Sequence, residues 1–134
     1  DKDSEGLILM TNNGEIMDKI LRSVNGHEKE YVVTVNKTID ESFIKRMSGG
    51  IYLRELDRTT NKCLAEKLSD KTFRIILTQG LNRQIRRMCA ACGFKVIKLK
   101  RIRIMNIELG DLKTGGYRDV TKEEYEKLIY MLNK

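Results

Sequence analysis

Proline and tryptophan are absent from this chain of 134 residues, histidine occurs once, and cysteine occurs three times. The lack of proline argues against a proline-rich linker, so we expect a single domain that is large enough to have its own core. No apolar run approaches the roughly 20 residues that a membrane-spanning helix needs. An odd number of cysteines argues against a disulfide scaffold and favours a reducing, cytoplasmic setting.

Several kinds of catalytic site also lack the residues they need. His27 has no serine or cysteine at an informative spacing, so a nucleophilic triad is not expected. Cys89 and Cys92 have C-x-x-C spacing, but a tetrahedral zinc site needs four good ligands, and two small residues in a helix core explain the pair better. Glycine-rich phosphate-binding motifs are missing as well. We therefore expect neither a metal nor a nucleotide cofactor.

Acidic residues are missing from one part of the chain. Between positions 71 and 107 the sequence has ten lysines or arginines and no aspartate or glutamate. The whole chain has 26 basic and 19 acidic residues, a net charge of +7, so the remainder has 16 basic against 19 acidic residues. Positive charge confined to one stretch is typical of a surface that binds a polyanion.

Within this stretch, residues 80–88 read Gly-Leu-Asn-Arg-Gln-Ile-Arg-Arg-Met. Gly80 marks a turn and Asn82 is a plausible N-cap, so we expect a helix to begin there. Helical spacing puts apolar residues on one face: Ile85, Met88, Cys89 and Cys92. It puts three arginines on the other side: Arg83, Arg86 and Arg87. Arginines near a helix N-terminus can bind phosphate or carboxylate groups. The alternative interpretation is an ordinary basic helix face exposed to solvent.

The remaining sequence mixes strand and helix patterns. Strands are expected at 6–11, 28–36, 51–53, 61–68, 72–79 and, with a bulge near Lys100 and Arg101, 95–109. The apolar run 6–11 is typical of a strand buried on both faces.

Helices are expected at 15–24, at 41–47 after the cap Asp40, and after Thr121, where Thr-Lys-Glu-Glu forms a capping box. Among their inward residues we expect Leu21, Val24 and Tyr125. These patterns predict an α+β fold with a mixed, mainly antiparallel sheet and helices packed on it.

The chain opens with an acidic loop, Asp-Lys-Asp-Ser-Glu-Gly, just before the first strand. Alone, such a loop is ordinary solvated surface. A carboxylate there gains significance if the basic helix faces it, because Arg86 would then keep it ionised and oriented as a nucleophile or base.

Three spaced segments resemble the signature motifs of ribosomal RNA pseudouridine synthases, most closely the RluF type. Residues 1–12 resemble the catalytic motif, whose spacing assigns Asp1 rather than Asp3 as the catalytic aspartate. Lys-Glu-Tyr at 29–31 resembles the Lys-x-Tyr motif, and Gln-Ile-Arg at 84–86 resembles the core of the third motif. The family's Gly-Arg-Leu is missing before Asp1. We therefore expect residues 1–134 to be a fragment of the catalytic domain, without the usual N-terminal RNA-binding domain.

The resemblance implies a cofactor-free isomerisation of uridine to pseudouridine, with large-subunit ribosomal RNA as the expected partner. The target base would be flipped out of its stack. Asp1 would act as nucleophile or assist detachment of the base, Tyr31 would stack on the base, and Arg86 would pair with Asp1. The expected RNA-binding residues are Lys29, Asn82, Arg83, Gln84, Arg87, Lys98, Arg101 and Arg103.

Two alternatives share the basic stretch: a non-catalytic RNA-binding domain and a ribosome-associated structural protein. Neither needs Asp1 and Tyr31 in one place, so a cleft that brings Asp1, Arg86 and Tyr31 together would favour the enzyme. We expect a monomer that does not contact membranes.

Overall fold

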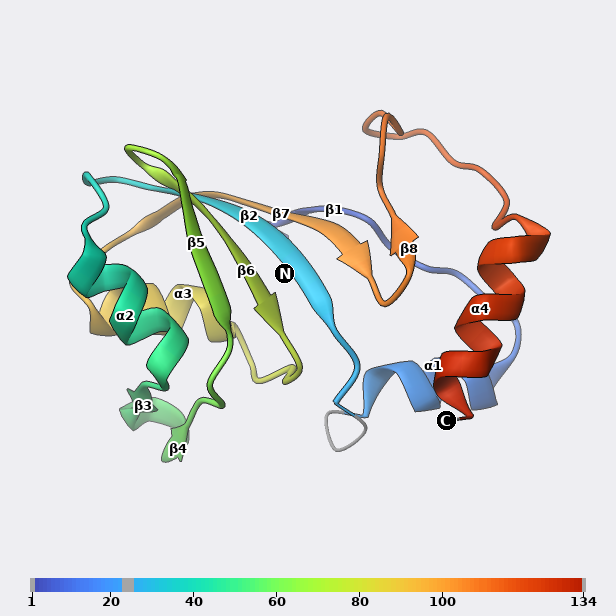
Figure 1. The fold of residues 1–134 in the computed structure, drawn as a ribbon, viewed down its shortest axis with the longest axis horizontal. Helices are drawn as coiled ribbons and strands as arrows, with labels where there is room; N and C mark the ends of the chain where they lie inside the picture. The colour runs from blue at the N-terminus through green and yellow to red at the C-terminus, as the bar shows by residue number, and fades with distance from the viewer. Residues whose placement is uncertain (1, 23–25, 134) are drawn as a thin grey trace.

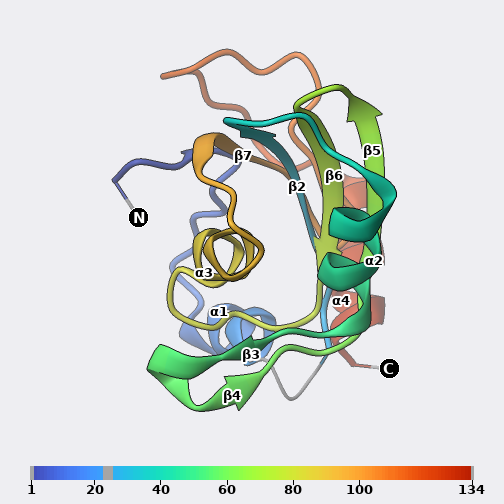
Figure 2. The same cartoon turned by 90° about the vertical axis from the view of Figure 1, so that its left-hand side faces the viewer.

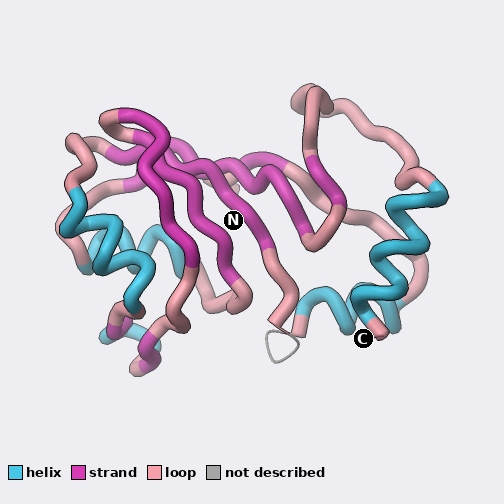
Figure 3. The backbone as a smooth tube through the Cα atoms, viewed as in Figure 1, coloured by secondary structure: helices cyan, strands magenta, loops and turns pink. Residues whose placement is uncertain are grey.

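The computed structural model describes residues 2–22 and 26–133, and it confirms the predicted α+β class. Its main sheet is mixed and mainly antiparallel, and only its first pair of strands is parallel. The strand order is β1 (Glu5–Gly6), β7 (Val96–Ile104), β2 (Lys29–Val35), β6 (Thr72–Leu77) and β5 (Leu64–Ser69), and β8 (Ile107–Glu108) pairs with β7. Figure 3 shows these strands as one curved layer.

Helices lie at both ends of this layer (Figure 1). At one end are α2 (Glu41–Gly49) and α3 (Gln84–Ala91), and at the other are α1 (Gly14–Leu21) and α4 (Lys122–Leu132). A small hairpin, β3 (Tyr52–Leu53) and β4 (Arg58–Thr59), follows α2 and encloses the short 3-10 helix η2 (Arg54–Leu56). Figure 2 shows α3 nearly end-on, in the hollow of the curved sheet beside β2 and β6.

Two hydrophobic cores correspond to these two ends. The larger core joins the sheet to α2 and α3, and it includes the fully buried side chains of Val33, Phe73 and Met88. Phe43 packs edge-to-face on Phe73, with 5.2 Å between ring centroids. The smaller core joins the end of β7 to α1, β8 and α4 around Met105. Strand β7 contributes to both cores and therefore connects them.

A β-bulge lies where the alternation of the β7 sequence slips. Tyr31 pairs with Arg101 and Glu30 pairs with Arg103, so Ile102 has no partner on β2. We predicted a bulge near Lys100 and Arg101. The structure confirms a bulge at Ile102, one residue further along the chain. It turns Arg103 to the opposite face of the sheet from Arg101. The predicted strand 95–109 is in fact two strands, because Met105 and Asn106 form a turn between β7 and β8.

The prediction for the run 6–11 is only partly right. Leu7 is buried, but Ile8 is 71% exposed and Met10 is 88% exposed. Among the described residues only Glu5–Gly6 pairs as a strand in this region, with β7, so no neighbouring element covers the outer face of the run. The apolar run 6–11 was therefore not a reliable sign of a strand that is buried on both faces.

Helix boundaries are close to those expected, but the inward faces differ at two positions. Asp40 caps α2 by accepting a hydrogen bond from the Phe43 amide at 2.8 Å, as predicted. Leu21 is 64% exposed and Tyr125 is 50% exposed, so these two were wrongly placed inward. Val24 lies outside the described residues. In the part of the chain that the structure describes, no helix has the length and apolar character to cross a membrane.

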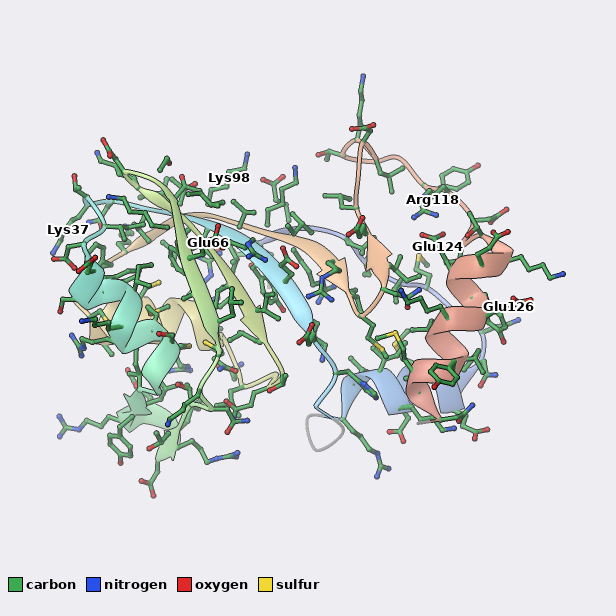
Figure 4. The ribbon with its side chains drawn as sticks, in the orientation of Figure 1. Lys37, Glu66, Lys98, Arg118, Glu124 and Glu126 are labelled. Carbon is green, nitrogen blue, oxygen red and sulfur yellow. The ribbon has the colours of Figure 1, made fainter. Side chains whose placement is uncertain are left out.

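The capping box of α4 is confirmed. Thr121 Oγ1 accepts from the Glu124 amide at 3.1 Å, and the Glu124 carboxylate accepts from the Thr121 amide at 2.9 Å. Arg118 donates to both carboxylate oxygens, and Figure 4 shows the two side chains meeting above the helix. These bonds, chiefly those from Arg118, lower the pKa of Glu124 to about 2.

The cap should therefore weaken in acid. Because the folded-state pKa of Glu124 lies below its ordinary value of 4.5, its stabilising effect is complete above about pH 4.5 and is lost as pH falls towards 2. Glu124→Gln should lower the melting temperature at pH 6 and have little effect at pH 2. Thermal unfolding followed by circular dichroism measures this difference. Glu126→Gln, on an exposed side chain of the same helix, is the control. If Glu124→Gln lowered the melting temperature equally at both pH values, the stabilising role of the Glu124 charge would be contradicted.

Candidate active-site cleft

A cleft of about 430 Å³ lies between the N-terminal segment, the sheet and the start of α3. Residues from all three predicted motifs line it. The first motif contributes Ser4 to Leu7, the second contributes Tyr31, and the third contributes Arg83 to Arg86. Arg101 of β7 lines it as well. Its volume is in the range of small-molecule sites. Segments far apart in sequence thus converge on one concave surface.

Arg86 joins the third motif to the first. Its Nη2 donates to the backbone oxygen of Asp3 at 2.9 Å and approaches Ser4 Oγ at 3.4 Å. The arginine reaches the acidic loop from the first half of α3, as the family resemblance implied. Asp1, the expected partner of Arg86, lies outside the described residues. The expected Asp1–Arg86 ion pair therefore stays a prediction, while contact between this arginine and the acidic loop is observed.

Tyr31 and Arg101 lie opposite each other on the antiparallel strands β2 and β7. Directly opposed residues project from the same face of a sheet, and both line the cleft. Each side chain is half-buried. An aromatic ring and a guanidinium therefore form the floor of the cleft next to the acidic loop.

Buried glutamines organise the loop that leads into α3. Gln84 Oε1 accepts from the Leu81 amide at 3.2 Å, and Gln84 Nε2 donates to Gln79 Oε1 at 3.4 Å. Gln79 Oε1 also accepts from the Asn61 amide at 2.7 Å. Gln84 lines the cleft but is only 5% exposed, and both atoms of its amide are bonded within the protein, so its expected contact with RNA stays a prediction. The sequence analysis missed Gln79; the signal was a polar residue that ends an apolar strand just before a glycine.

The beginning of α3 differs from the prediction. Arg83, not Asn82, is the N-cap residue, and it adopts the left-handed conformation without a side-chain cap bond. Asn82 instead binds Arg87, accepting from its Nε through the backbone oxygen and from its Nη2 through Oδ1. The Asn82 side chain therefore fixes the half-buried guanidinium of Arg87 instead of serving as the predicted cap.

Lys29 and Arg103 are not at the cleft surface, although both were expected to contact RNA. Lys29 is 7% exposed, and its Nζ lies 3.4 Å from the backbone oxygen of Ile20. Burial, and secondarily the nearby Arg101, lower the pKa of Lys29. Arg103 lies on the other sheet face because of the bulge, where it binds Glu28 and Glu30 at 3.0 and 2.8 Å.

Glu30 lies at the centre of an ion-pair network across the sheet. It accepts hydrogen bonds from Arg103 and from Arg74, and Arg74 also binds Glu66 at 2.8 Å. Burial alone would raise the pKa of Glu30, but the hydrogen bonds from these two arginines outweigh it and lower the pKa. Lys98 similarly pairs with Glu5 at 3.3 Å. Several basic residues of the stretch 71–107 are thus paired with glutamates from other parts of the chain.

The cysteines show the properties of core residues. Burial raises the pKa of Cys89 to about 12 and that of Cys63 to about 11, which disfavours the thiolates needed for redox or metal chemistry. Within the described ranges no cluster of three or more histidine, cysteine, aspartate or glutamate side chains is arranged to hold a metal ion.

Comparison with known proteins identifies relatives of the whole chain. Residues 1–91 match the family described as RNA pseudouridylate synthase. The chain is 51% identical over 132 residues to the dual-specificity RNA pseudouridine synthase RluF of Escherichia coli, covering 98% of this chain and 45% of that protein. It is 33% identical over 132 residues to the ribosomal large subunit pseudouridine synthase B of Bacillus subtilis, covering 96% of this chain and 54% of that protein.

A solved structure supports the same family. A crystal structure of a pseudouridylate synthase superposes with a TM-score of 0.87 at 34% identity, covering 92% of this chain and 54% of that one. The chain thus spans about half the length of the curated relatives it matches.

Replacing Gln84 should test the support beneath the cleft. Gln84→Leu keeps the approximate size but leaves the Leu81 amide without its acceptor, so we expect a loss of about 1–3 kcal/mol of unfolding free energy. The Leu81 amide should also exchange its hydrogen faster. Denaturant unfolding and hydrogen exchange measure the two effects. Asn12→Ala, at an exposed position in the loop before α1, is the control. Unchanged exchange at Leu81 would contradict the proposed support.

Proposed function

This chain belongs to the RNA pseudouridylate synthase family, and on that basis we propose that it carries out the isomerisation of uridine to pseudouridine in RNA. The observation that carries the proposal is the contact between Arg86 of the third motif and the Asp3–Ser4 backbone and hydroxyl of the first, in a cleft floored by Tyr31. A non-catalytic RNA-binding domain has no need for this convergence.

In the proposed reaction the glycosidic bond from C1′ to N1 breaks, a bond from C1′ to C5 forms, the proton at C5 is lost, and N1 takes up a proton. The product has the same composition as the substrate, so no net oxidation or group donor is required. A base in a helix cannot reach a side chain at the bottom of a cleft. We therefore propose that the target nucleotide is flipped into it.

The catalytic roles follow from the family resemblance and from the chemistry of the lining. Asp1 acts on the sugar as nucleophile or assists detachment of the base, and Arg86 holds its carboxylate ionised. Tyr31 provides an aromatic face on which the flipped uracil stacks, a contact typical of base recognition.

Ribosomal RNA is the proposed substrate, and large-subunit RNA in particular. The name of the Bacillus subtilis relative specifies the large ribosomal subunit. The relatives are about twice as long as this chain, which supports the proposal that residues 1–134 are catalytic-domain sequence that works beside further RNA-binding sequence. Arg83 and Arg87 at the start of α3 are the proposed phosphate contacts around the cleft.

Salt should test the phosphate contacts. Each phosphate neutralised by a side chain adds about 0.7–0.9 to the slope of log affinity against log salt. We expect Arg83→Gln and Arg87→Gln each to reduce the slope for a ribosomal RNA fragment by about 1. Arg74→Gln removes the same charge from an arginine already bound by two glutamates, so its slope should equal that of the unmodified protein. Filter binding over a salt series measures the slopes, and a flat slope for the unmodified protein would refute the polyanion interface.

Replacing Asp1 should separate chemistry from binding. Asp1→Asn, made in the natural full-length protein, keeps size and polarity but removes the charge. Pseudouridine formation should become undetectable while RNA affinity stays within about 2-fold, because losing a negative charge cannot weaken attraction to RNA. The assay is tritium release from C5-labelled uridine, run beside filter binding.

The control for this experiment is Asp18→Asn, on an exposed carboxylate of α1 that pairs with Arg22. Asp3→Asn tests the motif register. Turnover that survives Asp1→Asn but not Asp3→Asn would move the assignment to Asp3. Turnover that survives both would overturn the proposed use of an aspartate from this loop.

A further inference from the structure

Arg101 binds both backbone polar groups of one residue in the N-terminal segment, Leu7. Its backbone oxygen accepts from the Leu7 amide at 2.8 Å, and its side-chain Nε donates to the Leu7 carbonyl oxygen at 2.8 Å. The backbone bond continues the short parallel pairing of β1 with β7. The side-chain bond has no equivalent in an ordinary sheet. It uses the planar guanidinium in a fixed direction. We refer to these two bonds as the Leu7 clamp.

Gly6 makes the clamp possible. Its φ of +116° lies where other residues are strained, and a Cβ at this position would lie 2.2 Å from the Arg101 backbone oxygen and 2.5 Å from its backbone nitrogen. Backbone atoms in a sheet cannot move aside as a flexible side chain can. Only glycine therefore allows the segment to approach β7 closely enough for both bonds to form.

The clamp lies within the cleft. Gly6, Arg101 and Tyr31 form a row across β1, β7 and β2, and all three line the cleft. Three residues before Gly6, the same segment is held by Arg86 from α3. The segment is thus fixed at one end by a helix and at the other by the sheet.

We infer that Arg101 and Gly6 are positioning residues, which set the acidic loop in place relative to Tyr31 and α3, and that Arg101 is not a phosphate contact. The inference rests on the proposed function. The Arg101 guanidinium joins β7 to the N-terminal segment, two elements that line the cleft, so its bond to the Leu7 carbonyl contributes orientation to the reaction. Its loss should therefore reduce turnover at saturating RNA, because small misplacements of reacting groups cost about 100-fold in rate.

The first test replaces Arg101 in the natural full-length protein. Arg101→Gln should reduce kcat about 100-fold, with KM and the salt slope of RNA binding unchanged. Arg101→Lys keeps the charge but lacks Nε and the planar fork, so it should not restore kcat. Lys100→Gln removes a neighbouring charge on the same strand, outside the cleft lining, and is the matched control. A phosphate contact would behave differently: Arg101→Gln would reduce the salt slope by about 1, and Arg101→Lys would be nearly normal.

The second test removes no charge. Gly6→Ala should reduce kcat as Arg101→Gln does, while Gly14→Ala, whose added methyl meets nothing within 4 Å, should not. Because both substitutions break the same Leu7 clamp, kcat of the double variant should be only slightly lower than kcat of either single variant. Circular dichroism melting checks folding, and if Gly6→Ala fails to fold, the Arg101 variants decide.

The outcomes distinguish failure of the positioning role from failure of the proposed function. An unmodified protein that makes no pseudouridine refutes the proposed function. An active unmodified protein whose Arg101→Gln variant keeps its kcat, or loses only affinity, refutes the positioning role alone. Additive losses in a folded double variant would show that Gly6 and Arg101 act separately, which also contradicts the clamp.

Discussion

The pairing of β7 with β2 is the interaction on which the rest of the structure depends. These strands run through the middle of the sheet and form its longest ladder, and β7 contributes side chains to both hydrophobic cores. On its other side β7 holds Glu5–Gly6, so the acidic loop takes its position from the same strand. The cleft exists because one strand pairs with the second motif on one edge and with the first motif on the other.

The bulge at Ile102 divides the charge of β7 between two faces. In a regular strand Arg101 and Arg103 would point the same way, since side chains alternate with a period of two. Because their partners Tyr31 and Glu30 are adjacent on β2, Ile102 is an extra residue in β7. Arg101 therefore faces the cleft beside Tyr31, whereas Arg103 joins Glu28 and Glu30 on the opposite face. One arginine thus becomes part of the site, and the other joins an ion-pair network that links neighbouring strands.

Rigidity around the cleft comes from polar groups at buried positions. Gln79 and Gln84 hold the loop before α3, Lys29 reaches the backbone oxygen of Ile20, and Arg101 holds Leu7. A buried donor or acceptor without a partner costs free energy, so each of these groups favours one loop geometry over others. Preorganisation of this kind lowers a reaction barrier through positioning and electrostatics.

The sequence by itself determined the fold class, most element positions, the capping box of α4 and the convergence of three motifs on one function. These features depend on local periodicity, on cap chemistry and on motif spacing, all of which are written along the chain. Tertiary structure decided which basic residues are available to a ligand. Lys29 is buried, with its Nζ near the Ile20 backbone oxygen, and the bulge turns Arg103 to the opposite sheet face, where Glu28 and Glu30 bind it. The faces of Leu21 and Ile8 were likewise decided by which elements lie beside them, because exposure depends on neighbours that local sequence does not specify.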